Sequence, residues 1–249
     1  MLTHRTPEGP LYRIGWGTKP WEFPDWLRAG TDASSGAHTF GNRFDDPDAQ
    51  YRVLYAASQL VSCYVETLAR FRPDFRLLEE LDAMEGDNDF QQIGLVPDEW
   101  FENRYIGTAN VEGKYADLYS QEWVAHLRPK LYTVCRDLGL DDFDLSVLIQ
   151  AKKRIITQMA SSFVYDLGGY NGIYYASRHG LGLENWALFE FKAVIHQVGD
   201  VRRVAKDDQA LRQALDLLKL HVAGEPICVV EERRRFEWVY ELFQGRKRS

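Results

Sequence analysis

Four polar side chains offer chemistry along a chain that is otherwise rich in apolar segments. Arg43 lies in the glycine-led bend HTFGNRFDDP (38–47), Tyr55 in a predicted strand, Glu66 on a predicted helix, and Ser177 directly after another predicted strand. A guanidinium can bind a phosphate group through two parallel hydrogen bonds. A carboxylate stabilises positive charge that develops in a transition state. These residue types therefore favour a phosphate-bearing substrate whose reacting centre becomes cationic.

Each of these residues also has an ordinary structural interpretation. A loop arginine or a helical glutamate most often faces solvent, and a strand tyrosine most often packs with its hydroxyl at an edge. A serine after a strand is most often a plain loop residue. Helical spacing places Ser62 one turn before Glu66, so Glu66 lies at the border of the apolar stripe of its helix. Taken singly, none of the four residues assigns a function.

Local patterns predict the elements that must position these residues. Residues 51–57 (YRVLYAA) are predicted as a short strand rich in β-forming side chains, and Ser58 suits the N-cap of the helix that follows. From residue 59 to residue 71 the apolar side chains recur every three or four positions, which is typical of an amphipathic helix that Pro73 closes. Tyr55 and Glu66 are thus expected on consecutive elements.

The rest of the chain mixes helices and strands. Strands are predicted at 10–15, at 173–177, within 184–198 and at 227–231. Helices are predicted at 122–140 with a proline interruption, from Asp142 or Asp144 to 167, at 207–226 with a stop at Gly224 and Pro226, and at 234–243. Residues 75–85 suit a helix or an edge element, and residues 94–119 look mixed and irregular. Because no strict βαβ rhythm appears, the fold class is α+β.

Composition narrows the class of protein. The 249 residues, 45% of them hydrophobic, suit one globular domain, because no linker or internal repeat divides them. The net charge of −7 argues against nucleic-acid or anionic-membrane binding, so an anionic ligand needs locally placed arginine or lysine. Three cysteines without CxxC spacing and six scattered histidines predict neither a disulfide framework nor a metal site. With no leader and no membrane-length apolar run, we expect a cytoplasmic protein.

Three stretches, taken in order, resemble the RES domain family. GNRF lies about a dozen residues before VLYAAS, VETL follows on the next helix, and GYNGIYYASRHGLGLENWALF comes later. The opening LYRIG is similar to the first strand of that family. The resemblance extends from about Leu11 to the ENWALF segment (184–189). Common catalytic motifs such as a P-loop, GxGxxG, HExxH and GxSxG are missing from the sequence.

This resemblance implies both a fold and an activity. RES proteins are similar in fold to ADP-ribosyltransferases, with a mixed or antiparallel sheet, surrounding helices and here a helical insert. They degrade NAD+ by cleaving its nicotinamide–ribose bond, with phosphate or water as acceptor. The resemblance assigns catalytic roles to Arg43, Tyr55, Glu66 and Ser177, and substrate binding to Arg13, Arg43, Tyr55 and Ser177. NAD+ is then a substrate, inorganic phosphate a co-substrate, and no metal or other cofactor is expected.

The sequence also departs from the family pattern. Asn42, Phe44 and Asp45 stand where the family usually has the second glycine, the tryptophan and the asparagine of GGRWN. The interval between Glu66 and Ser177 is longer than in the compact toxins. We therefore expect a single domain over 1–249, with a core at about 11–71 and 145–230 and an insert at about 72–144. These departures leave substrate preference and toxicity open.

Three functions remain open at this point. The first is an NAD+ phosphorylase or glycohydrolase, which the resemblance implies to be a toxin of a toxin–antitoxin module with an Xre-type antitoxin as its partner. The second is an ADP-ribosyltransferase that modifies a protein. The third is a non-enzymatic nucleotide-binding or interaction module. No direct nucleic-acid or membrane binding is expected, a homo-oligomer stays open, and helix 234–243 is a candidate partner surface.

Overall fold

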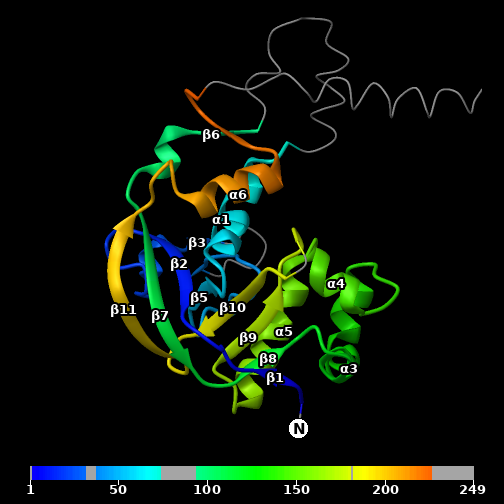
Figure 1. Ribbon diagram of the computed structural model, residues 1–249. Helices are drawn as coiled ribbons and strands as arrows, with labels where there is room; N and C mark the ends of the chain where they lie inside the picture. The colour runs from blue at the N-terminus through cyan, green and yellow to red at the C-terminus, as the bar shows by residue number, and fades with distance from the viewer. Residues whose placement is uncertain (1, 32–37, 74–93, 181, 226–249) are drawn as a thin grey trace, which may run out of the picture.

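The computed structural model describes residues 2–31, 38–73, 94–180 and 182–225 (Figure 1). Its strands are β1 (His4–Arg5), β2 (Leu11–Trp16), β3 (Gly30–Thr31), β4 (His38–Thr39), β5 (Val53–Ala57), β6 (Leu95–Val96), β7 (Arg104–Glu112), β8 (Tyr115–Asp117), β9 (Gly172–Ala176), β10 (Glu184–Phe189), β11 (Val194–Arg203) and β12 (His221–Val222). Its helices are α1 (Leu60–Leu68), α3 (Gln121–Asp137), α4 (Leu145–Gln150), α5 (Arg154–Leu167) and α6 (Gln209–Leu218), with the short 3-10 helices η1 (Trp26–Arg28), η2 (Ala69–Phe71) and η4 (Asp98–Phe101).

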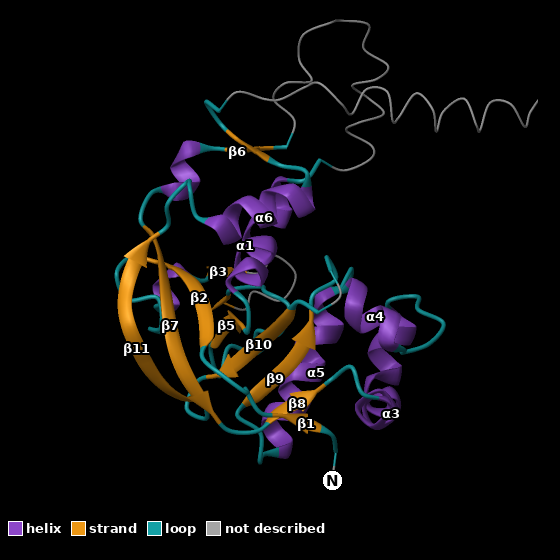
Figure 2. Cartoon of the chain, viewed as in Figure 1, coloured by secondary structure: helices purple, strands orange, loops and turns teal. Residues whose placement is uncertain are grey.

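An eight-stranded mixed sheet forms the centre of the molecule, in the order β1-β8-β9-β10-β5-β2-β7-β11. Neighbouring strands are antiparallel except β8 and β9, which are parallel. The sheet curls, and α1 with α6 covers one part of it while α3, α4 and α5 lie beside the strands at its other end (Figure 2). This arrangement confirms the predicted α+β class with a mixed sheet and surrounding helices.

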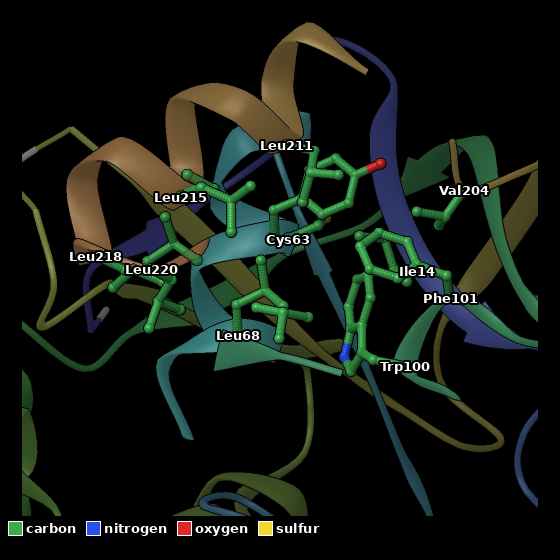
Figure 3. Close-up of a cluster of buried hydrophobic side chains, with 14 of the residues drawn as sticks. Ile14, Cys63, Leu68, Trp100, Phe101, Val204, Leu211, Leu215, Leu218 and Leu220 are labelled. Atoms are coloured by element: carbon green, nitrogen blue, oxygen red, sulfur yellow. The ribbon is translucent and has the colours of Figure 1, made fainter. Parts of the chain in front are cut away.

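Two hydrophobic clusters attach these helices to the same face of the sheet. In the first, Leu211, Leu215 and Leu218 of α6 face Cys63 and Leu68 of α1 (Figure 3). The second joins α3 and α5 to β5, β9 and β10. Since alternate residues of a strand share a face, the β5 residues at positions 53, 55 and 57 point to these clusters. The polar residues of interest lie where the two clusters meet, because Tyr55 packs against the second and Ala57 belongs to the first.

The predicted strand and helix around Tyr55 and Glu66 are confirmed, with one correction at the helix start. Gln59, not Ser58, is the N-cap residue of α1, and it provides no side-chain cap. The Ser58 hydroxyl instead accepts a hydrogen bond from the Trp186 indole nitrogen at 2.9 Å. The Ser58 hydroxyl therefore binds a residue of β10 and does not cap α1, although its type and position favour capping.

The helix expected from Asp142 or Asp144 to 167 is in fact two helices. Asp144 is the N-cap of α4, as expected, and its carboxylate accepts from the Val147 backbone at 3.0 Å. The chain then turns at Ala151, which has a left-handed φ of 46°, and α5 begins after Lys153. The break matters for function, because the last carbonyls of a helix lack partners within it and can accept from elsewhere.

Two further segments were predicted wrongly. Residues 94–119 contain β7 and β8, both of which lie in the main sheet, so the interval 72–144 is not a separate insert. Gly107 weakens the strand signal of β7, since glycine is uncommon inside strands. The fold requires glycine at this position, because a Cβ there would lie 2.5 Å from Pro20. The segment 184–198 holds two strands, β10 and part of β11, because the chain turns at Phe191 with φ 66°.

Two helices end or continue differently from expectation. Helix α3 runs through Pro129 without interruption, since that proline lies on the exposed face while a buried stripe at Trp123, Leu127 and Leu131 holds the helix down. Helix α6 stops at Lys219 in a left-handed conformation, before Gly224. The elements predicted at 75–85, 227–231 and 234–243 lie outside the described residues. Within the part of the chain that is described, no helix is long and apolar enough to span a membrane.

Candidate active site

The loop that carries Arg43 is folded around one carboxylate. Asp45 accepts from the Asn42 backbone at 2.7 Å and from the Asn42 amide at 2.8 Å, and Gly41 before them has a left-handed φ of 69°. The Tyr55 hydroxyl donates to Asp45 at 2.8 Å and accepts from the Phe44 backbone at 2.9 Å. Burial raises the pKa of Asp45, while these hydrogen bonds lower it. Tyr55 therefore fixes the shape of the arginine loop.

Helix α5 holds the same loop from the other side. The Gln158 side chain donates to the Asn42 carbonyl at 3.0 Å, and the Ser161 hydroxyl donates to the Phe44 carbonyl at 2.7 Å. Ser161 is fully buried, so this second bond is screened from water. The loop is thus tied to both β5 and α5 on either side of Arg43.

Arg43 itself reaches under α4. Its Nη2 donates to the Tyr119 hydroxyl at 3.0 Å, to the Ile149 carbonyl at 3.2 Å and to the Leu148 carbonyl. The guanidinium carbon lies 5.2 Å from the centre of the Tyr175 ring, and Nε is buried without a hydrogen-bond partner. No carboxylate pairs with Arg43 among the described residues. Its positive charge is therefore held in place and left without a counter-ion.

Glu66 approaches from α1. Its side chain is exposed, and Oε1 accepts from the Asn185 amide at 3.2 Å. Asn185, at the start of β10, is buried, and its amide oxygen accepts from the buried Ser62 hydroxyl at 2.9 Å. Because the Glu66 carboxylate can only accept, the NH₂ group of Asn185 faces it, and Ser62 supports this orientation by donating to the amide oxygen. A fixed amide thus orients an exposed carboxylate.

Tyr175 lies between Arg43 and Glu66. The Arg43 guanidinium carbon is 5.2 Å from the Tyr175 ring centre, and Tyr175 pairs in register with Asn185, whose amide donates to Glu66. The charges of both residues accordingly act on the pKa values of three side chains. Burial raises the pKa of Tyr175 well above its usual value, Glu66 raises it further, and Arg43 lowers it. Tyr119 follows the same pattern, with burial dominant, Arg43 lowering its pKa and Glu66 raising it. Burial lowers the pKa of His179, Glu66 opposes that change, and Arg43 contributes to it.

Ser177 and His179 lie together at the end of β9. The Ser177 hydroxyl accepts from the His179 backbone at 3.1 Å, and its own backbone donates to the Leu183 carbonyl at 2.8 Å. The Nε2 atom of His179 accepts from Arg178 at 3.2 Å, which assigns the proton of a neutral imidazole to Nδ1. Ser177 thus closes a short turn beside the centre that Arg43 and Glu66 share.

Arg13 connects two backbone segments. On β2, its Nε donates to the Pro20 carbonyl and its Nη1 to the Tyr55 carbonyl, both at 2.6 Å. Burial lowers its pKa to about 10, and nearby Cys63 and Tyr55 partly offset this. Arg13 is not among the charges that act on Tyr175, Tyr119 or His179. Arg13 thus ties the Pro20 backbone to that of Tyr55, and its part in substrate binding stays a prediction.

Sequence reasoning named Arg43, Glu66 and Ser177, and the structure brings these around one centre, with Tyr55 supporting the arginine loop. It missed four neighbours, which are Tyr119, Tyr175, His179 and Asn185. Three of them lie within the GYNGIYYASRHGLGLENWALF stretch, so that stretch carried their signal. Tyr119 follows β8 and had no local signal, because the parallel pairing of β8 with β9 brings it to Ala176, whose carbonyl accepts from its hydroxyl at 3.0 Å. Across the described residues, no group of three or more His, Cys, Asp or Glu side chains is placed to hold a metal ion.

Comparisons with known proteins found one similar structure and one family. The crystal structure of the M. tuberculosis MbcT–MbcA toxin–antitoxin complex contains a similar chain, 13% identical, with 88% of this chain and 91% of that chain covered and a TM-score of 0.44. A TM-score below 0.5 makes this a remote likeness. No curated protein sequence matches the chain. The profile of the RES domain matches residues 10–209, which is most of the chain and includes every site residue above, and the protein therefore belongs to the RES domain family.

Proposed function

We propose that this protein cleaves the nicotinamide–ribose bond of NAD+ and transfers the ADP-ribosyl group to phosphate or water. Membership of the RES domain family supports an NAD+-utilising enzyme. The observation that carries the proposal is the arrangement of Arg43 and Glu66 around Tyr175. Its ring centre lies 5.2 Å from the Arg43 guanidinium carbon, and it pairs in register with Asn185, which donates to Glu66. A fixed cation without a counter-ion and an exposed carboxylate meet there, and NAD+ presents a pyrophosphate and a ribose that becomes cationic.

Arg43 would bind the pyrophosphate. Three acceptors already hold its Nη2, so its orientation is set before substrate arrives, and no reorganisation is needed on binding. The Tyr55 hydroxyl is committed to Asp45 and to the Phe44 backbone. Tyr55 then acts as a positioning residue for Arg43, and Ser177 is the hydroxyl that would orient the nicotinamide riboside.

Glu66 would act on the ribose. In the reaction the bond between C1′ and the nicotinamide nitrogen breaks, and its electron pair neutralises the pyridinium, so the leaving group needs no proton. The positive charge that develops on the ribose is stabilised by the Glu66 carboxylate, which Asn185 holds at 3.2 Å. A phosphate oxygen, or a water that then loses a proton, forms the new bond to C1′. The absence of a general acid from this scheme agrees with a neutral His179.

Product analysis tests the proposal. Purified protein is incubated with NAD+ with and without inorganic phosphate, and products are separated by chromatography beside a Glu66→Gln control. Phosphate-dependent release of nicotinamide together with ADP-ribose-1-phosphate would identify a phosphorylase, and release with free ADP-ribose a glycohydrolase. No release by folded protein that binds NAD+ would contradict enzymatic cleavage and favour a binding module.

The same incubation separates the other proposals. Labelled NAD+ added with cell extract leaves label on protein only if the acceptor is a protein side chain. A toxin role with an Xre-type antitoxin follows from the family alone. Growth arrest on expression of the wild-type protein but not of Glu66→Gln would support it, and equal growth would contradict it.

A further inference from the structure

A second arginine site lies away from Arg43 and Glu66, where β2 and β7 meet. Arg104 is the first residue of β7 and pairs in register with Trp16, the last residue of β2. Its side chain is 7% exposed. The guanidinium carbon lies 4.3 Å from the ring centre of Trp16 and 4.8 Å from that of Trp100. Trp16 is 55% exposed, whereas Trp100 packs into the cluster with Ile14 and Phe101 (Figure 3).

The guanidinium of Arg104 lacks the acceptors that a buried arginine needs. Its Nε is buried without a hydrogen-bond partner, and its side chain forms no ion pair or hydrogen bond with any described residue. The indole nitrogen of Trp100 beside it is a second buried donor without a partner. Native structures rarely leave buried donors unpaired, and each such case calls for an explanation.

Three half-buried arginines in the same molecule do find oxygen acceptors, although Nε of Arg43 is also without a partner. Arg13 donates to two backbone carbonyls, and Arg43 to two carbonyls and a hydroxyl. Arg52 forms a forked pair with Glu190 and donates to the Pro24 carbonyl at 2.8 Å. Arg104 has two indole faces instead, which attract a cation but accept none of its five N–H groups in the guanidinium plane.

The charges around Arg104 also indicate that an anionic partner is missing among the described residues. Burial, and to a smaller extent the charge of Arg70, lower the pKa of Arg104 to about 10. No acidic group offsets either effect among the residues that the structure describes. A buried guanidinium beside a second unpaired donor, with no acidic partner among the described residues, is suited to bind an acceptor from outside the site.

We propose that Arg104, with Trp16 and Trp100, forms an oxyanion-binding site separate from the proposed NAD+ site. A carboxylate or phosphate group would take the free edge of the guanidinium through parallel hydrogen bonds. The exposed face of Trp16 would cover the same group from solvent. The site does not depend on NAD+ chemistry and would exist in an inactive protein as well.

Nuclear magnetic resonance can test this site in the full chain. Two nearby indole rings should move the Nε–H signal of Arg104 away from those of other arginines, and Arg104→Lys assigns it by its loss. Titration with inorganic phosphate, and separately with acetate, should shift this signal saturably at an ionic strength matched with chloride. Response to both anions indicates general oxyanion binding, and response to phosphate alone indicates a phosphate ligand.

Two variants make the outcome decisive. In Arg43→Gln the Arg104 signal should still respond, which separates this site from binding at the proposed NAD+ site. Trp16→Ala keeps the fold, since that ring is mostly exposed, and should weaken the apparent anion affinity about tenfold. An Arg104 signal that moves no more with phosphate or acetate than with chloride would overturn the proposal, as would a response that disappears in Arg43→Gln.

Discussion

The two sides of the proposed NAD+ site are built in opposite ways. On the arginine side, Arg43 is held by three acceptors from α4 and the β8 end, and its loop is tied to β5 and α5. On the glutamate side, Glu66 is exposed and accepts one hydrogen bond at 3.2 Å. The difference suggests that the anion-binding charge is fixed before substrate arrives, whereas the carboxylate keeps most of its acceptor capacity for the substrate.

The largest effect should come from removing the charge on the glutamate side. Glu66→Gln keeps the shape of the side chain and can still accept from Asn185, but it cannot stabilise a cationic ribose. We expect kcat for nicotinamide release to fall by about 10²–10³-fold, with the free energy of unfolding changed by less than about 0.5 kcal/mol because the residue is exposed. Glu102→Gln, an exposed glutamate outside the site, is the matched control. Normal turnover by Glu66→Gln would remove Glu66 from the mechanism.

Arg43→Lys tests whether the arginine side depends on geometry as well as charge. A lysine keeps the charge but cannot contact Tyr119 and two carbonyls while presenting further donors to a pyrophosphate. We expect KM for NAD+ to rise about 10–100-fold, which corresponds to ~1.5–3 kcal/mol of lost binding. The exposed Arg28→Lys serves as the control. An unchanged KM would show that Arg43 does not bind the substrate.

Tyr55→Phe separates a positioning role from a catalytic one. Loss of the hydroxyl removes the hydrogen bond to Oδ1 of the buried Asp45 carboxylate and leaves the Phe44 backbone N–H without its partner. We expect the free energy of unfolding to fall by about 1–3 kcal/mol, and KM to rise more than kcat falls, because the arginine loop loosens while Glu66 is untouched. Chemical denaturation and steady-state kinetics measure both quantities. A variant of normal stability with a much reduced kcat would instead make Tyr55 a catalytic residue.

How far the sequence predicts each side also differs. The glutamate side was foreseeable, because α1 follows from a strong apolar period and β5 from a short run of β-forming residues. Arg43 was foreseeable as a residue but its environment was not, since Tyr119 and Ile149 lie 76 and 106 positions away in the chain. Contacts between residues far apart in the chain produce no periodic pattern in the local sequence. The break between α4 and α5, which leaves helix carbonyls free to accept from Arg43, was not predicted because the apolar pattern continues across it.

Strand β7 is the clearest case of what was missed. Its sequence RYIGTANVE carries Gly107 and Asn110, which weaken a strand signal, yet the strand pairs with both β2 and β11. Gly107 is required there by the close approach of Pro20 and Trp21. Because the strand was missed, so was Arg104 at its start. Arg13 and Arg43 were therefore assigned from sequence motifs, whereas Arg104 is identified only by its contacts in the structure.

A smaller effect is expected from loosening the support of Glu66. Ser62→Ala removes the bond that orients the Asn185 amide, while the backbone of α1 stays unchanged. We expect kcat to fall about tenfold or less, with KM for NAD+ nearly constant, because Arg43 still binds the pyrophosphate. A purely structural role would lower stability without this split between kcat and KM. Ser62→Thr keeps the hydroxyl and should restore part of the lost kcat if the side chain fits.

The smallest effect concerns pH, through a residue that faces both sides. Burial lowers the pKa of His179 from its usual value near 6.5, as do Arg178, Arg72 and Arg43, while Glu66 opposes them. The unfolded chain therefore binds this proton more readily than the folded protein. Its contribution to stability is fully present above about pH 6.5 and is lost as the pH falls through the lowered pKa. Unfolding measured from pH 7 to pH 5 should thus show a shallower loss of stability for His179→Gln than for the wild type. Equal slopes would mean that His179 binds its proton equally well in the folded and the unfolded chain, and so that burial and the neighbouring arginines do not shift its pKa.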